Sequence, residues 1–218
     1  MSAAAVWAVL RKECRSEWRT RYGINSALLF SLTTLTAVSF AAGRLGDRVD
    51  LAAALMWIVL LFASLASLAH AFVREVEGHT MTTLRLVASP TEIALGKLGF
   101  NLVFLAVLEA FTIPLVLILL GAPTPDWGPF FAVLALGSLA LAACATLIGA
   151  LISQTRGRGA LFAGVSLPLL LPVLAATVGG TRLQWQGTFP AAELKLLGAY
   201  AAGLFGVSLL LYDHLWEE

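Results

Sequence analysis

The sequence predicts an all-α polytopic membrane protein with six transmembrane helices, an amphipathic N-terminal interfacial helix and a short cytoplasmic coupling helix between spans two and three. Of 218 residues, 59% are hydrophobic and 12% are charged, and the mean hydropathy is +0.88. Soluble domains have about 45–50% apolar and roughly 25% charged residues, which excludes a water-soluble domain. Six charge-poor segments each approach the roughly 20 apolar residues that span about 30 Å of hydrocarbon. They are 24–42, 51–73, 98–121, 127–152, 160–178 and 196–212.

The basic residues predict the orientation of these spans. The net charge of +1 gives no indication of nucleic-acid binding, so positions are more informative than totals. Ten basic residues lie before span one, between spans two and three or between spans four and five, whereas four lie in the opposite loops. The positive-inside rule therefore predicts that both termini are cytoplasmic. The ten are Arg11, Lys12, Arg15, Arg19, Arg21, Arg74, Arg85, Lys97, Arg156 and Arg158.

Residues 1–23 are predicted to form an amphipathic helix on the cytoplasmic membrane surface, followed by a six-span domain over 24–218. Trp7, Leu10, Cys14 and Trp18 recur at spacings of three and four, and the basic residues lie largely on the other side. Tryptophan beside a basic face is typical of a helix in the headgroup layer. A helix packed against a soluble partner remains the alternative.

The longest predicted cytoplasmic connection, 74–97, has the pattern of a short helix held between two long ones. Span two is expected to end at Gly78, because glycine commonly follows a helix C-terminus. A short helix is then expected over about 81–88, with Thr80 as its N-cap.

Prolines predict one helix start and three kinks. Residues 89–92, Ser-Pro-Thr-Glu, match a capping box with proline at the first helical position, so a helix should begin at Pro90 and continue into span three. Pro114 lies inside span three, and Pro168 and Pro172 lie inside span five. Proline removes a backbone hydrogen bond, so we expect kinks at these positions. Such kinks can be static irregularities of helix packing or moving hinges, and the sequence does not distinguish the two.

Glu109 is the only carboxylate well inside a predicted span. A charge there costs at least about 2.5 kcal/mol on insertion scales, so Glu109 should face protein and not lipid. It is protonated or bonded to polar residues of neighbouring spans, and either a structural hydrogen bond or a place in a substrate path would fit. Candidate partners on the first span are Ser31, Thr33, Thr34 and Thr36.

The sequence lacks the motifs of an ATPase or a metalloenzyme. It has no GxxxxGK[ST] loop, and its histidines, His70, His79 and His214, are far apart. No second catalytic group at helical spacing accompanies Glu109, which argues against an intramembrane enzyme. We therefore predict no catalytic residue, no cofactor-binding residue and no metal ligand.

Several of these features together resemble the membrane subunits of ABC type-2 exporters, and among them the cytochrome c-type biogenesis family CcmB. The resemblance covers nearly the whole chain. One departure is that Gly78-His79 stands where many family members have Asp-Gly. The residues that carry the resemblance are 72–81, Leu84, Pro90, Lys97, Pro114, Gly121, Arg158-Gly159 and the double-proline segment 167–174.

The resemblance implies a non-catalytic permease subunit in the bacterial inner membrane. ATP would be hydrolysed by a separate CcmA-type ATPase, and haem would be handled by CcmC, CcmD and CcmE-type partners, with release of the haem chaperone CcmE as the outcome. Type-2 permeases work as pairs of six-span halves, so the resemblance also implies a homodimer in contact with membrane lipid. An ABC type-2 exporter of a drug, lipid or polysaccharide is the alternative.

On this interpretation the helix over 81–88 docks in a groove of the ATPase, and the chain acts as a mechanical relay and not as a haem carrier. None of its histidines is placed on the periplasmic side, and stable haem binding usually needs an enclosed axial ligand. The predicted ATPase-coupling residues are Glu75, Glu77, Gly78, Thr80, Leu84, Leu86 and Pro90.

Overall fold

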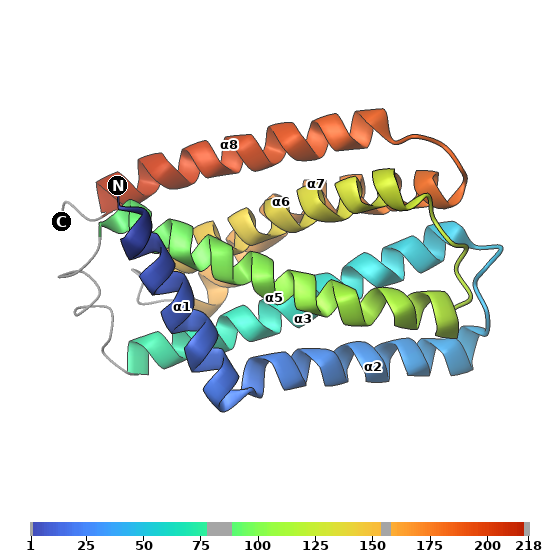
Figure 1. Ribbon diagram of the computed structural model, residues 1–218, viewed down its shortest axis with the longest axis horizontal. Helices are drawn as coiled ribbons and strands as arrows, with labels where there is room; N and C mark the ends of the chain where they lie inside the picture. Colours follow the sequence, from blue (N-terminus) through green and yellow to red (C-terminus); the bar gives the residue numbers. More distant parts are fainter. Residues whose placement is uncertain (1, 78–88, 154–157, 216–218) are drawn as a thin grey trace.

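The computed structural model describes residues 2–77, 89–153 and 158–215, and within these ranges it is entirely helical (Figure 1). The prediction of an all-α protein is confirmed. The described helices are α1 (Ala3–Thr20), α2 (Tyr22–Ala42), α3 (Val49–Glu77), α5 (Pro90–Leu119), α6 (Trp127–Ser153), α7 (Arg158–Trp185) and α8 (Ala191–Leu215).

Six of these helices have 21 to 30 residues, and each overlaps one of the six predicted apolar segments. Among the described residues, three stretches are long and apolar enough to cross a membrane. They are Tyr22–Ala42, Thr91–Leu119 and Trp127–Ile148. Long apolar helices satisfy their own backbone hydrogen bonds, which is the requirement for crossing hydrocarbon.

The long helices run roughly lengthwise beside one another, and α1 crosses one end of the bundle obliquely (Figure 1). The first turns of α1 and α5 and the last turns of α3 and α8 lie at that end. The loops that follow α2, α5 and α7 lie at the opposite end. The helices therefore bring α1 and the helix ends that flank the predicted coupling helix to one end of the molecule.

The core of the bundle surrounds α6, which packs against α3, α5, α7 and α8. In its most apolar stretch 72% of the residues are buried, against 28% in the corresponding stretch of α5. Every residue from 140 to 148 of α6 is buried. Thus α6 is an internal helix, whereas much of the α5 surface is left uncovered by the chain.

Gly137 allows α6 to lie close to α3 and α7 in this core. A Cβ atom built on Gly137 of α6 would lie 2.6 Å from Cη2 of Trp57 and 2.7 Å from Cγ2 of Thr177. Trp57 of α3 is fully buried, and its indole N–H donates to Oγ1 of Thr181 at 2.8 Å. The hydrogen bond satisfies the polar atom that burial of tryptophan would otherwise leave without a partner.

The three intrahelical prolines lie where the sequence places them. Pro114 lies inside α5, and Pro168 and Pro172 lie inside α7. Each helix continues on both sides of its prolines. The kinks themselves remain a prediction.

Candidate functional site

The predicted ATPase-coupling residues divide between the described and undescribed parts of the chain. Glu75 and Glu77 lie in the last two turns of α3, and Pro90 is the first residue of α5. The helix predicted over 81–88 lies outside the described residues, together with Gly78, Thr80, Leu84 and Leu86. The structure therefore describes the two helices that flank the coupling segment.

The start of α5 has the capping box that the sequence predicts. The Ser89 Oγ accepts a hydrogen bond from the backbone N–H of Glu92 at 3.4 Å. The backbone N–H of Ser89 in turn donates to Oε2 of Glu92 at 3.0 Å. This confirms the predicted start at Pro90, and it fixes the direction in which the chain enters α5.

Glu92 also joins α5 to α1. Its Oε1 atom accepts a hydrogen bond from the backbone N–H of Ser2, the N-cap residue of α1, at 2.6 Å. The carboxyl group is buried and receives N–H donors from two segments of the chain. Hydrogen bonds to a charged acceptor are about twice as strong as neutral ones. Glu92 therefore holds the first turns of α1 and α5 together.

Two glycines let α1 lie close against α5. A Cβ atom built on Gly96 would be 2.6 Å from Cβ of Val9, and one on Gly99 would be 3.5 Å from Cδ1 of Leu10. Val9 is buried by this contact. A larger residue at Gly96 would require α1 to move, so the position of α1 depends on the absence of a side chain there.

A second carboxylate holds the other end of α1. Arg21, between α1 and α2, adopts a left-handed conformation with φ of 53° and provides no side-chain cap. The Oε1 atom of Glu17 accepts from the backbone N–H of Ile24 at 2.9 Å, and Glu17 is buried. The N–H groups of a first helical turn lack partners within the helix, so Glu17 caps α2 from a distance.

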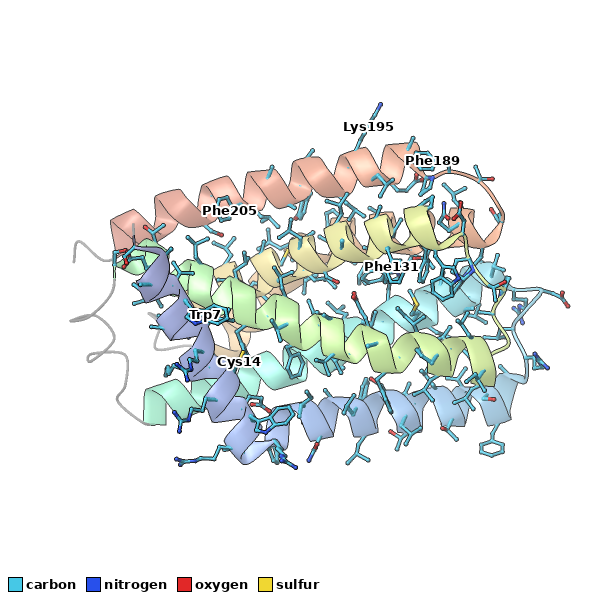
Figure 2. All side chains as sticks on the ribbon, viewed as in Figure 1. Trp7, Cys14, Phe131, Phe189, Lys195 and Phe205 are labelled. Carbon is cyan, nitrogen blue, oxygen red and sulfur yellow. The ribbon has the colours of Figure 1, made fainter. Side chains whose placement is uncertain are left out.

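The predicted apolar side of α1 does not pack as a unit. Val9 is buried against the bundle and Leu10 is half-buried, whereas Trp7 and Trp18 are 64% and 72% exposed. Figure 2 labels Trp7 and Cys14 on this helix. The contact with α5 is thus made through Val9 and Leu10, while Trp7 and Trp18 lie outside it. The position of this helix in the headgroup layer stays a prediction.

Basic side chains and Trp7 line a shallow groove on the outer side of α1. This outer groove is formed by α1 residues over four turns. Arg21 lies over the ring of Trp18 at 5.5 Å from its centroid, a cation–π distance. The lining residues are Trp7, Ala8, Arg11, Lys12, Arg15, Ser16, Arg19 and Thr20.

Inside the bundle, Glu109 is bonded to α6. The Ser138 hydroxyl donates to Oε1 of Glu109. The first predicted span does not supply this partner, because the Ser31 hydroxyl donates to the carbonyl of Ala27 and that of Thr33 to the carbonyl of Leu29. Serine and threonine in helices commonly satisfy themselves in this way. The tertiary structure thus selects a partner that lies 29 residues away in the sequence.

The described residues include no cluster of three or more His, Cys, Asp or Glu side chains suited to a metal ion. His70 lies on α3 and His214 on α8, and His79 lies outside the described ranges. Polar contacts that join one helix to another include those between α1 and α5, α1 and α2, α5 and α6, and α3 and α7.

Comparison with known proteins identifies the family. The profile of the family described as CcmB protein matches residues 4–212. The chain belongs to the CcmB family. This match runs from α1 to α8, so the N-terminal helix is part of what the CcmB family shares. The predicted resemblance is confirmed, and with it the prediction of a non-catalytic membrane component.

Three relatives carry the name Heme exporter protein B. The protein of Paracoccus denitrificans is 29% identical over 195 residues, which cover 88% of this chain and 89% of the relative. That of Rhodobacter capsulatus is 28% identical over 204 residues, covering 89% and 90%. That of Bradyrhizobium diazoefficiens is 29% identical over 181 residues, covering 82% and 81%. The similarity to these CcmB relatives thus extends over most of each chain.

Proposed function

We propose that this chain is the permease subunit of an ABC-type complex that exports or handles haem for cytochrome c maturation in the bacterial inner membrane. The observation that carries the proposal is the CcmB family match over residues 4–212. The three relatives named Heme exporter protein B support it. In this proposal α2, α3, α5, α6, α7 and α8 all cross the membrane, and both termini are cytoplasmic.

A separate CcmA-type ATPase would drive the complex by binding the segment between α3 and α5. Glu77 ends one long helix and Pro90 begins the next, so this segment has a long helix at each end. A movement of the segment would act directly on Ser89 and Glu92, since these residues form the capping box of α5.

Helix α1 gives such a movement a second route into the membrane. Glu92 binds Ser2 at one end of α1, and Glu17 at the other end binds the start of α2. A displacement at the start of α5 would therefore be passed through α1 to α2. The proposed relay thus acts on spans one and three together, and not through the kinked spans alone.

The three sides of α1 support its place at the cytoplasmic membrane surface. One side packs on α5 through Val9, the edge with Trp7 and Trp18 is exposed, and the basic residues line the outer groove. Tryptophan prefers the headgroup level, and Lys and Arg favour the cytoplasmic side. In this orientation the outer groove faces anionic headgroups and cytoplasm.

Haem would be handled by CcmC, CcmD and CcmE-type partners, with no haem or ATP bound by this subunit and two copies of it in the complex. His70 and His214 lie on the parts of α3 and α8 nearest the proposed cytoplasmic side. An axial ligand for haem transport would be required in an enclosed pocket on the path of the haem. Their placement favours a relay over a haem carrier.

Coexpression with candidate ATPase and haem-handling subunits tests this proposal. Replacing Leu84 and Leu86 by Asp should abolish copurification of the ATPase while membrane insertion remains normal. The matched control is Phe189→Asp, which changes an exposed apolar residue at the opposite end of the bundle (Figure 2). Survival of copurification in the double variant would contradict the coupling assignment. Copurification of the ATPase without haem-handling subunits would favour an exporter of another substrate.

A further inference from the structure

The side of α5 around Glu109 is incompletely covered by the described part of the chain. Val103 and Val107 are 48% and 40% exposed, and Glu109 is half-buried. Most of the apolar stretch Thr91–Leu119 is likewise unburied. In water-free hydrocarbon an apolar exposed side can face lipid, but a carboxyl group there is unfavourable. This position therefore needs a contact that residues 2–77, 89–153 and 158–215 do not provide.

Among the described residues, only one of the two carboxyl oxygens of Glu109 receives a hydrogen bond. Ser138 donates to Oε1, and within the described part of the chain no second donor contacts this carboxyl group. A carboxyl group has two oxygens and can accept several hydrogen bonds. Leaving one oxygen without a partner in an apolar medium costs free energy, in either protonation state. The second oxygen, Oε2, is thus available to a partner molecule.

Small side chains flank the carboxyl group. Ala106 and Ala110 are exposed on α5 on either side of Glu109, and Ala135 is exposed on α6, one turn before Ser138. Small residues allow the backbones of membrane helices to approach closely. Figure 2 shows Phe131 on α6, one further turn away. We call the surface formed by Val103, Ala106, Val107, Glu109, Ala110 and Ala135 the Glu109 face.

We propose that the Glu109 face receives a transmembrane helix of a different membrane subunit, which donates a hydrogen bond to Oε2 from a hydroxyl, amide or basic side chain. The proposal rests on the proposed function, because it takes α5 to cross the membrane. It goes beyond that function by assigning a docking surface and the chemistry of its partner.

A second copy of the chain does not fit this face. Most homodimers are two-fold symmetric and pair the same surface on both subunits. Such pairing would bring a second carboxyl group to the first, and the Ser138 hydroxyl of each copy already donates to its own Glu109. The other residues of the face are Val and Ala, which offer no side-chain donor. A donor must therefore come from a different sequence.

Photocrosslinking in the coexpressed complex tests the proposal. A benzophenone amino acid replaces Ala110, and a control probe replaces Leu171, which is exposed on α7. We expect an Ala110 adduct with a different membrane protein, crosslinked within one helical turn of a residue that carries a donor. Glu109→Leu should lower this adduct by about three- to twentyfold, the range of interhelical hydrogen bonds in membranes. In Glu109→Gln the remaining oxygen can accept from the partner while the Ser138 hydroxyl accepts from the amide NH₂, so this variant should leave the yield near that of the unmodified chain.

Three outcomes would overturn the proposal: an adduct with a second copy, an adduct with lipid alone, and a yield that does not change in Glu109→Leu. If Glu109→Leu also removes the Leu171 adduct, the fold of this variant is altered. The test of the docking surface then uses Ala106→Trp. Ala106 is exposed, so tryptophan there leaves the internal packing intact and should block the partner helix. Absence of the ATPase from the unmodified complex would contradict the proposed function, and not this inference.

Discussion

Two close helix contacts in this protein each depend on a glycine, yet they are secured differently. Gly137 lets α6 approach Trp57 in the core, where apolar burial and a neutral hydrogen bond to Thr181 hold the helices. Gly96 lets α5 approach Val9 of α1 at the edge of the bundle. There the contact is held by the Glu92 carboxylate, which binds the N–H of Ser2.

From this difference we expect α1 to separate from α5 while the bundle stays folded. Core packing is lost as a unit, because each buried side chain contacts several others. At the edge, the buried residues of α1 are Val9 and Glu17, and parts of a fold with few buried side chains open at lower free energy. The predictions below separate these two contacts.

Trp57→Ala should have the largest effect. It removes a fully buried indole from the core, and Trp→Ala changes in cores cost about 3–5 kcal/mol. The measurement is the free energy of unfolding in detergent, from titration with dodecyl sulfate. Trp7→Ala, at an exposed position, is the control and should cost much less. Equal losses in the two variants would contradict the assignment of Trp57 to the core.

Gly96→Ala should displace α1 with little effect on the bundle. The new Cβ would be 2.6 Å from Cβ of Val9, and overpacking typically costs about 1–3 kcal/mol. We expect faster proteolysis within α1 and an almost unchanged unfolding transition of the remaining helices. Gly198→Ala on α8 meets no atom within 4 Å and should leave both measurements unchanged. If α1 resists proteolysis equally in Gly96→Ala and in the unmodified chain, the close contact between Gly96 and Val9 does not decide whether α1 stays on α5.

Glu92→Gln should weaken the same contact by a smaller amount. Both carboxyl oxygens accept N–H groups, so the amide NH₂ of Gln would place a donor against a donor. Hydrogen bonds to charged groups are worth about 1.5–3 kcal/mol, of which the remaining carbonyl keeps a part. Proteolysis of α1 measures the effect. Glu13→Gln, which changes the exposed pair with Lys12, should have almost none.

The reactivity of the Cys14 thiol should also report the position of α1, and we expect this change to be the smallest of those predicted here. Burial raises the pKa of the Cys14 thiol, and the neighbouring Glu13 carboxylate raises it further. Because the thiolate is the reactive form, maleimide labelling near neutral pH should be slower than for an ordinary thiol and should rise at higher pH.

Displacing α1 should lower the Cys14 pKa toward its ordinary value, so Gly96→Ala should shift the labelling profile to lower pH. Cys144 is buried in the core and serves as the internal control, because its labelling should not respond. Identical Cys14 profiles in the two proteins would mean that α5 does not shield this thiol.

The sequence by itself determined the helices, the capping box and the family. Apolar length predicts each long helix because a helix satisfies its own backbone, and this needs no information on neighbours. Residues 89–92 predict the start of α5 because the hydrogen bonds of a capping box join residues three apart.

Only the tertiary structure decided which groups meet across helices. Glu17 and Glu92 gave no signal of their contacts with Ile24 and Ser2, because these depend on how α1 lies against α2 and α5. The exposure of Trp7 depends on which side of α1 faces the bundle. Ser138 meets Glu109 because α6 packs beside α5 at that height, and helical periodicity assigns a side chain to a face but not to a neighbouring helix.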